Sequence, residues 1–273
     1  MSLVSLNSVQ FAVNYSHEAV NLADAGEIQF DLCKLPAWPD LVRQVHPKYP
    51  GYIHFNLAAG DGSLERVNWA ELVELQEYTN TLNCNLHLVA PQGYDLSSKV
   101  QYQAALDCIV RDVAFVCQRI GAQRVIVETY PMYSLGREWL LPAVEPSSVN
   151  HIVDETGCGF LLDLAHCRLT AATLHMPEQE YISALPVKAL RELHIVGVGE
   201  VNGVWMDHFP MTPPDWDCLD WSLGKITQGE WRTPEIAALE YGGLGEVFRW
   251  RTKAEVLRTE VPAIWRRLKG QVI

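Results

Sequence analysis

The sequence lacks the features that mark membrane, secreted and nucleic-acid-binding proteins. No apolar run approaches the roughly 20 residues of a membrane span, so we expect no membrane-spanning segment. The first fifteen residues lack the charged region and small-residue cleavage site of a signal peptide. With 33 acidic against 21 basic residues, the formal net charge is −12, which argues against a broad nucleic-acid surface.

Cysteine and glycine patterns exclude further classes. The seven cysteines are odd in number and contain no C-x-x-C, which favours reduced thiols in a cytoplasmic protein over a disulfide framework. There is no G-x-S-x-G segment, the sequence mark of one class of serine hydrolase. No glycine-rich phosphate-binding fingerprint follows a predicted strand, which argues against a doubly wound dinucleotide-binding sheet.

Short apolar runs alternate with helix-like stretches from end to end. Runs rich in Val, Ile, Leu and Phe are typical of parallel strands covered by helices. Eight such strands alternating with helices predict a single (β/α)8 TIM barrel spanning residues 1–273. The expected strands are 9–13, 28–32, 52–56, 85–89, 124–128, 159–163, 190–195 and 236–240. The expected helices include 69–79, 98–119, 147–155, 167–174 and 253–268, with Asn68 and Thr252 as N-caps.

One segment interrupts this alternation. Residues 197–234 follow the seventh predicted strand and hold Trp205, Trp216, Trp221, Trp231 and four prolines. Long loops in compact domains are usually functional or disordered, and the aromatic content argues against disorder. We therefore predict a long aromatic-rich insertion that forms a lid or a substrate wall.

Histidine and carboxylate residues recur at or near the ends of these strands. A lone histidine there is more often a core residue, and a lone carboxylate such as Asp163 more often caps a helix. In a barrel, however, the carboxyl ends of all strands meet at one face. Several buried carboxylates placed together would be costly without cations, and mixed nitrogen and oxygen ligands suit first-row transition metals. The pattern predicts a site for two or three metal ions, with ligands His54, His87, Glu128, Asp163, His166, His194, Asp207, His208 and Glu240.

The order of these residues resembles that of two related groups of proteins. The four most specific segments are 127–129 (VET), 162–166 (LDLAH), 192–197 (ELHIVG) and 206–208 (MDH). They are similar to motifs of the DUF692 family of multinuclear non-haem iron-dependent oxidative enzymes. That family lies within the xylose-isomerase-like superfamily of TIM barrels, which includes endonuclease IV.

The resemblance implies an iron enzyme that uses dioxygen to modify a cysteine-containing peptide, delivered by a partner protein. It implies two or three metal ions, with iron preferred and zinc or manganese as alternatives. Glu128, Glu240 and His194 would be the catalytic residues, with the two glutamates bridging metals from opposite sides of the barrel. The remaining six residues named above would complete the coordination of the ions.

The sequence departs from the family pattern at three places. The family has Asp-x-His where this chain has adjacent Asp207 and His208, and neighbours in an extended strand point in opposite directions. Both can face one site if the backbone turns between them. The family's Glu-Asn-x-Ser run is Glu128-Thr-Tyr-Pro here, and Val198 replaces a frequent histidine.

Three other interpretations fit the sequence. One is a sugar isomerase or epimerase that uses a single divalent metal and a carboxylate base. Another is a zinc phosphodiesterase similar to endonuclease IV, against which the net acidity counts. The last is a metal-bound scaffold without activity. The first requires no oxygen, so an oxygen requirement separates it from the oxidase.

Overall fold

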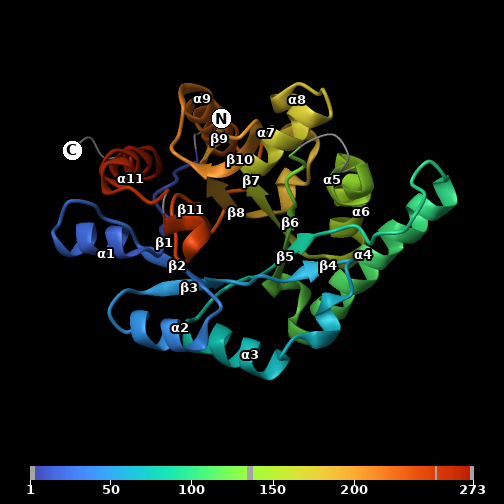
Figure 1. The fold of residues 1–273 in the computed structure, drawn as a ribbon, viewed down its shortest axis with the longest axis horizontal. Coiled ribbons are helices and arrows are strands. Elements are labelled where there is room, and N and C mark those ends of the chain that lie inside the picture. The colour runs from blue at the N-terminus through green and yellow to red at the C-terminus, as the bar shows by residue number, and fades with distance from the viewer. Residues whose placement is uncertain (1–3, 134–137, 250, 271–273) are drawn as a thin grey trace.

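A computed structural model describes residues 4–133, 138–249 and 251–270, so the predicted domain of residues 1–273 extends beyond them at both ends. Within these ranges, nine strands form one curled sheet in the order β3-β2-β1-β11-β8-β7-β6-β5-β4, and neighbouring strands are parallel. A separate antiparallel pair consists of β9 and β10. Helices surround the sheet on its outer side (Figure 1).

Each long strand is followed by at least one helix, which confirms the α/β fold. The sheet strands are β1 Gln10–Asn14, β2 Leu32–Pro36, β3 Gly51–His54, β4 Ala58–Ala59, β5 Cys84–Leu88, β6 Val125–Thr129, β7 Gly159–Asp163, β8 Leu190–Ile195 and β11 Ile236–Leu239. The hairpin consists of β9 Gly197–Val201 and β10 Val204–Phe209. The helices are α1 His17–Asp24, α2 Pro39–Val45, α3 Trp69–Tyr78, α4 Lys99–Ile120, α5 Leu141–Val144, α6 Pro146–Thr156, α7 Leu164–Thr173, α8 Glu178–Ala184, α9 Pro213–Thr227, α10 Glu246–Arg249 and α11 Ala254–Lys269.

The sheet curls far enough to bring its two ends together. Among the described residues, β3 has no ladder with β4 or β5. Side chains bridge this seam instead: the Phe55 amide donates to Asn85 Oδ1 at 2.7 Å, and the Ile53 amide donates to Thr81 Oγ1 at 2.9 Å. The His87 amide also donates to the Leu57 carbonyl at 2.9 Å. These hydrogen bonds join the two edges of the curled sheet.

Two sequence-based expectations need correction, and a third is confirmed. The second strand begins at Leu32, where the predicted strand ended, because residues 32–36 are those that pair with β1 and β3. Thr252 does not cap α11. Its N-cap is Lys253, and the Thr252 hydroxyl donates to the Phe248 carbonyl instead. Asn68 does cap α3, accepting from the Glu71 amide.

The segment 197–234 is largely regular structure. Its helix α9 lies between β8 and β11 along the chain, as the helix of an ordinary barrel repeat would. A capping box between Thr212 and Asp215 begins this helix, with Pro213 in its first turn. Only the hairpin β9–β10 and its connections are additional to this strand–helix repeat. The predicted aromatic-rich insertion over the whole of residues 197–234 is therefore not confirmed. No helix within the described ranges is long and apolar enough to cross a membrane.

Candidate metal centre

The parallel ladders align the predicted ligands at the carboxyl ends of the strands. His87 on β5 pairs with Glu128 on β6, and Asp163 on β7 pairs with His194 on β8. Glu240 directly follows β11, and its amide continues the ladder to the Ile195 carbonyl at 2.9 Å. Side chains of strand residues at equal height on one face must lie close together. The fold thus gathers these groups inside one end of the barrel.

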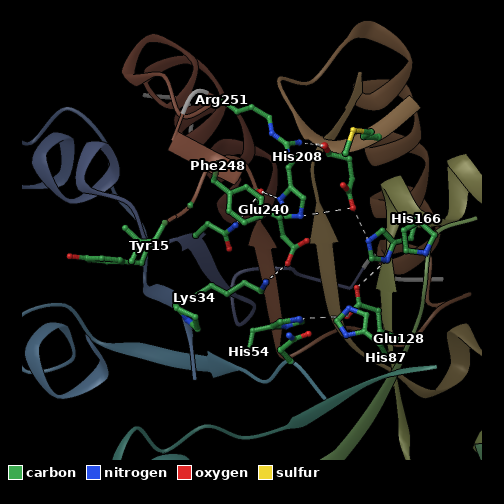
Figure 2. Close-up of a pocket in the computed structure, with 18 of the residues that line it drawn as sticks. Tyr15, Lys34, His54, His87, Glu128, His166, His208, Glu240, Phe248 and Arg251 are labelled. Carbon is green, nitrogen blue, oxygen red and sulfur yellow. Dashed lines mark hydrogen bonds and ion pairs between the residues drawn. The ribbon is translucent and has the colours of Figure 1, made fainter. Parts of the chain in front are cut away.

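Glu128 lies at the middle of this cluster and is 1% exposed. Its Oε2 lies 3.3 Å from His87 Nε2 and 3.8 Å from His54 Nε2. Its Oε1 lies 3.2 Å from His166 Nδ1 and 3.7 Å from His194 Nδ1. One carboxylate therefore faces four imidazoles from four different elements; Figure 2 shows three of them, His54, His87 and His166.

Asp163 and His166 come from the junction of β7 and α7. Asp163 caps α7 by accepting from the His166 amide at 2.8 Å through Oδ1. Its other oxygen, Oδ2, lies 3.7 Å from His166 Nε2 and 3.8 Å from His194 Nδ1. The His166 ring also contacts Asp207 Oδ2 at 3.0 Å and the Thr129 carbonyl at 2.9 Å. Asp163 is thus both a helix cap and a member of the cluster.

The hairpin strand β10 supplies the adjacent pair Asp207 and His208. The ladder to β9 shifts register between Met206 and Phe209, and His208 has a φ of 61°. That left-handed conformation is rare for a residue with a side chain, and it turns the backbone between the two residues. Both side chains therefore line the same cavity, with His208 Nε2 3.9 Å from Asp207 Oδ2. His208 Nδ1 donates to the Glu240 carbonyl at 2.6 Å.

The cluster contains three overlapping groups of three residues, and within each group the ligand atoms lie within 4.8 Å of one another. The groups are His54, His194 and Glu240; His54, His87 and Glu128; and Glu128, Asp163 and His194. His54, Glu128 and His194 each belong to two groups. His166, Asp207 and His208 adjoin the cluster but belong to none of these three groups.

Four buried polar atoms of the cluster have no hydrogen-bond partner among the described residues. Within the described part of the chain, His54 Nδ1, Glu128 Oε2, Asp163 Oδ2 and His194 Nδ1 are buried and lack a hydrogen-bond partner. Buried polar atoms are normally satisfied, and each exception needs an explanation. Metal ions bound by these lone pairs would provide one. The residues present therefore fit a multi-residue metal-binding site.

Charge and burial oppose each other throughout the cluster. Burial disfavours both a carboxylate and an imidazolium. For Glu128 the surrounding histidines outweigh burial and hold its pKa below its usual range. For Asp163 burial prevails and raises its pKa to about 7. The pKa of His194 rises to about 10 despite burial, chiefly because of Glu240, and nearby carboxylates also raise the pKa of His166.

Two buried residues orient His194 from behind. Glu192 Oε1 accepts from His194 Nε2 at 2.8 Å and from the Tyr52 hydroxyl at 2.7 Å. A carboxylate holding the second ring nitrogen fixes the tautomer and direction of a metal-binding histidine. Glu192 is itself buried, at 2% exposed, and was not among the predicted ligands. Its position two residues before His194, on the same face of β8, is the signal that could have identified it.

Lys34 is a further residue that the sequence pattern missed. It lies on β2, is 7% exposed, and its Nζ forms an ion pair with Glu240 Oε1 (Figure 2). On the neighbouring strand β3, the ring of His54 is held by the Asn85 amide, which donates to His54 Nε2 at 2.9 Å. The predicted second strand, 28–32, ended before Lys34, whereas β2 includes it.

The cluster forms the floor of a cavity of about 490 Å³. This volume is within the usual range for ligand pockets. Aromatic and apolar side chains form much of its wall, above the charged floor. These include Tyr15, Trp38, Tyr130, Tyr133, Met206, Leu244 and Phe248.

Known proteins similar to this chain agree with the fold. A UPF0276 protein of Rhizorhabdus wittichii is 22% identical over 197 residues, which cover 68% of this chain and 69% of that protein. A xylose isomerase domain containing protein from Salmonella typhimurium superposes with a TM-score of 0.58 at 12% identity, covering 99% and 100% of the two chains. The D-psicose 3-epimerase of Clostridium cellulolyticum gives 0.54 at 11% identity, covering 96% and 99%. These two structures establish a xylose-isomerase-like TIM barrel.

The family comparison is more specific. Residues 38–228 match the family described as RiPP precursor modification enzyme MbnB/TglH/ChrH, whose members act on ribosomally synthesised peptides that are later modified. The matched range contains eight of the nine predicted ligands, with Glu240 outside it. The resemblance to the DUF692 family is thereby confirmed, and the chain belongs to the MbnB/TglH/ChrH family of RiPP precursor modification enzymes.

Proposed function

We propose that this chain is an oxygen-dependent oxidase that modifies a cysteine-containing peptide at a centre of two or three metal ions, iron preferred. The observation that carries the proposal is the convergence of three overlapping ligand groups on the floor of one cavity. A single ion needs no more than one such group. Mixed imidazole and carboxylate donors are also suited to iron rather than to calcium or magnesium.

The chain's own residues would hold and orient the reacting groups. Glu128 belongs to two ligand groups and has two carboxylate oxygens, so it would keep neighbouring ions at a fixed separation. His194 would bind a single ion through Nδ1, because Glu192 holds its Nε2. The group of His54, His194 and Glu240, called the outer group below, could bind an ion through Glu240 and His54. Iron bound there would supply the redox chemistry that amino-acid side chains cannot provide. The largely apolar wall of the cavity would limit access of water to the floor.

The shape of the cavity suits a peptide side chain. Its floor is charged and metal-compatible, whereas its wall offers Tyr15, Trp38 and Phe248 for contact with a peptide. A thiol entering from the open side would reach the centre before the peptide backbone did. Presentation of the peptide by a partner protein would fit this one-sided access.

The test is an oxygen-dependent change in peptide mass. Protein loaded anaerobically with Fe²⁺ is mixed with a panel of synthetic cysteine-containing peptides, with and without dioxygen, and the products are analysed by mass spectrometry. The expected result is a mass change that requires both iron and dioxygen and disappears when cysteine is replaced by serine. Glu128→Gln protein serves as the control that keeps the barrel but lacks the central ligand. Identical products with and without dioxygen would contradict the proposal.

The competing function is a metal-dependent sugar epimerase, because a D-psicose 3-epimerase shares the fold. In that case Glu128 or Glu240 would act as the base beside one manganese or magnesium ion. Conversion of ketohexoses by manganese-loaded protein without dioxygen would favour it. Cleavage of a phosphodiester by zinc-loaded protein would instead favour the hydrolase interpretation.

A further inference from the structure

The ion pair between Lys34 and Glu240 places a protein cation inside the ligand cluster. A lysine is almost never fully buried unless it is paired. Here both side chains are buried, and Lys34 reaches Glu240 from β2 (Figure 2). The pairing therefore belongs to the centre itself, not to the protein surface.

Lys34 contacts the same oxygen that a metal ion in the outer group would need. Glu240 Oε1 is the atom paired with Lys34 Nζ, and it also lies 3.0 Å from His194 Nδ1. Metal–oxygen distances are about 2.0–2.2 Å, so an ion on this oxygen would lie within about 5 Å of the ammonium group. Two like charges this close inside a protein repel strongly. The group of His54, His194 and Glu240 is thus already occupied by a positive charge.

The total charge of the buried cluster points the same way. Five carboxylates lie within it, all at most 6% exposed: Glu128, Asp163, Glu192, Asp207 and Glu240. When all are ionised, two divalent ions together with Lys34 neutralise them. A third divalent ion would leave two uncompensated positive charges in a buried space, which is costly. Arg251, which donates to the Asp207 carbonyl at 3.0 Å, would add to that excess.

We propose that Lys34 takes the place of one metal ion, so that this chain binds two ions, in the two groups that contain Glu128, and not three. The inference rests on the metal centre of the proposed function but not on its redox chemistry. The two remaining groups do not include Glu240, so the ammonium leaves their ligands free. Lys34 also lines the cavity, beside the ions. There it presents a fixed positive charge to an incoming peptide.

The experiment counts ions in the full-length protein. Metal-free protein is titrated anaerobically with Zn²⁺ and separately with Fe²⁺, with calorimetry for affinity and mass spectrometry of the metals for stoichiometry. Lys34→Met removes the charge at similar length, Lys34→Arg keeps it, and Lys48→Met removes a surface lysine that pairs with Asp24. Thermal unfolding of each variant shows whether it is folded.

The expected result is two ions per chain for the wild type, Lys34→Arg and Lys48→Met. Lys34→Met should bind a third ion, with an affinity at least tenfold higher than that of any third ion in the wild type. Three tight ions in the wild type would overturn the role of Lys34 and leave the metal centre standing. An unchanged count in folded Lys34→Met would do the same. If Lys34→Met does not fold, the wild-type count alone decides. Absence of any bound ion in all proteins would overturn the centre and the proposed function together.

Discussion

Replacement of Glu128 by glutamine tests the centre at the atom on which it depends most. The change removes one negative charge and one ligand oxygen while keeping the shape of the side chain. Glu128 belongs to two of the three ligand groups and faces His54, His87, His166 and His194 within 3.8 Å. Both ions proposed above would lose a ligand at once.

The size of the effect follows from Coulomb's law. Two unit charges 4 Å apart interact by about 4 kcal/mol at an effective dielectric constant of 20, and a divalent ion in contact with the carboxylate interacts more strongly. A loss of about 4 kcal/mol lowers affinity about 1,000-fold. We therefore expect Glu128→Gln to bind each ion at least 1,000-fold more weakly, so that it loses its metal during dialysis.

The assay compares metal content after dialysis with unfolding in urea. The matched control is Glu200→Gln, which changes an exposed glutamate on β9 and should retain full metal content. Because glutamine fills the same space, Glu128→Gln should still unfold in one cooperative transition. Full metal retention in this variant would refute the assignment of Glu128 as the shared ligand, and with it the arrangement of the three groups.

Other changes test the surroundings of the centre. Glu240→Gln should destabilise the metal-free protein by about 3–5 kcal/mol in urea unfolding, because it leaves the buried Lys34 ammonium unpaired; an unchanged midpoint would argue against the pair. Glu192→Ala should weaken metal binding about 10–100-fold in calorimetry with the fold retained, because His194 loses its orienting acceptor. The pKa of His194 in the folded protein is about 10, above its usual 6.5. Protonated His194 therefore contributes fully to the stability of the metal-free protein below pH 6.5, and this contribution is lost as the pH rises to 10. Urea midpoints measured across that window should fall in the wild type and change less in His194→Gln. Limited proteolysis should yield no two stable halves, since we expect one cooperative domain.

Local sequence patterns predicted the parts of the site that depend on strand ends. The strands 159–163 and 190–195 agree with β7 and β8 residue for residue. The first is a short apolar run between Gly159 and Asp163, and the second alternates apolar residues with charged or polar ones. Each of these strands carries a ligand at or near its end, Asp163 and His194. Parallel pairing then brings the two ligands level. For such residues, position along the chain was sufficient.

Contacts between distant strands could not be predicted in this way. Tyr52 and Glu192 are 140 residues apart and meet across the barrel interior, a contact that no local period encodes. Lys34 was missed for a different reason. The apolar run at residues 28–32 resembles a strand, but Ile28 packs in the main core outside the sheet. The residues that pair with β1 and β3 are 32–36.

The seam of the barrel connects the fold with the centre. Of the three shared ligands, Glu128 and His194 lie on β6 and β8, which are joined through β7 by continuous ladders. His54 ends β3, at the edge of the sheet where the described strands form no ladder with β5. What holds it there is Asn85, whose side chain accepts from the Phe55 amide and donates to the His54 ring. An ion shared by His54 and Glu128 would therefore link the two sides of the seam, so that binding the metal and closing the barrel stabilise each other.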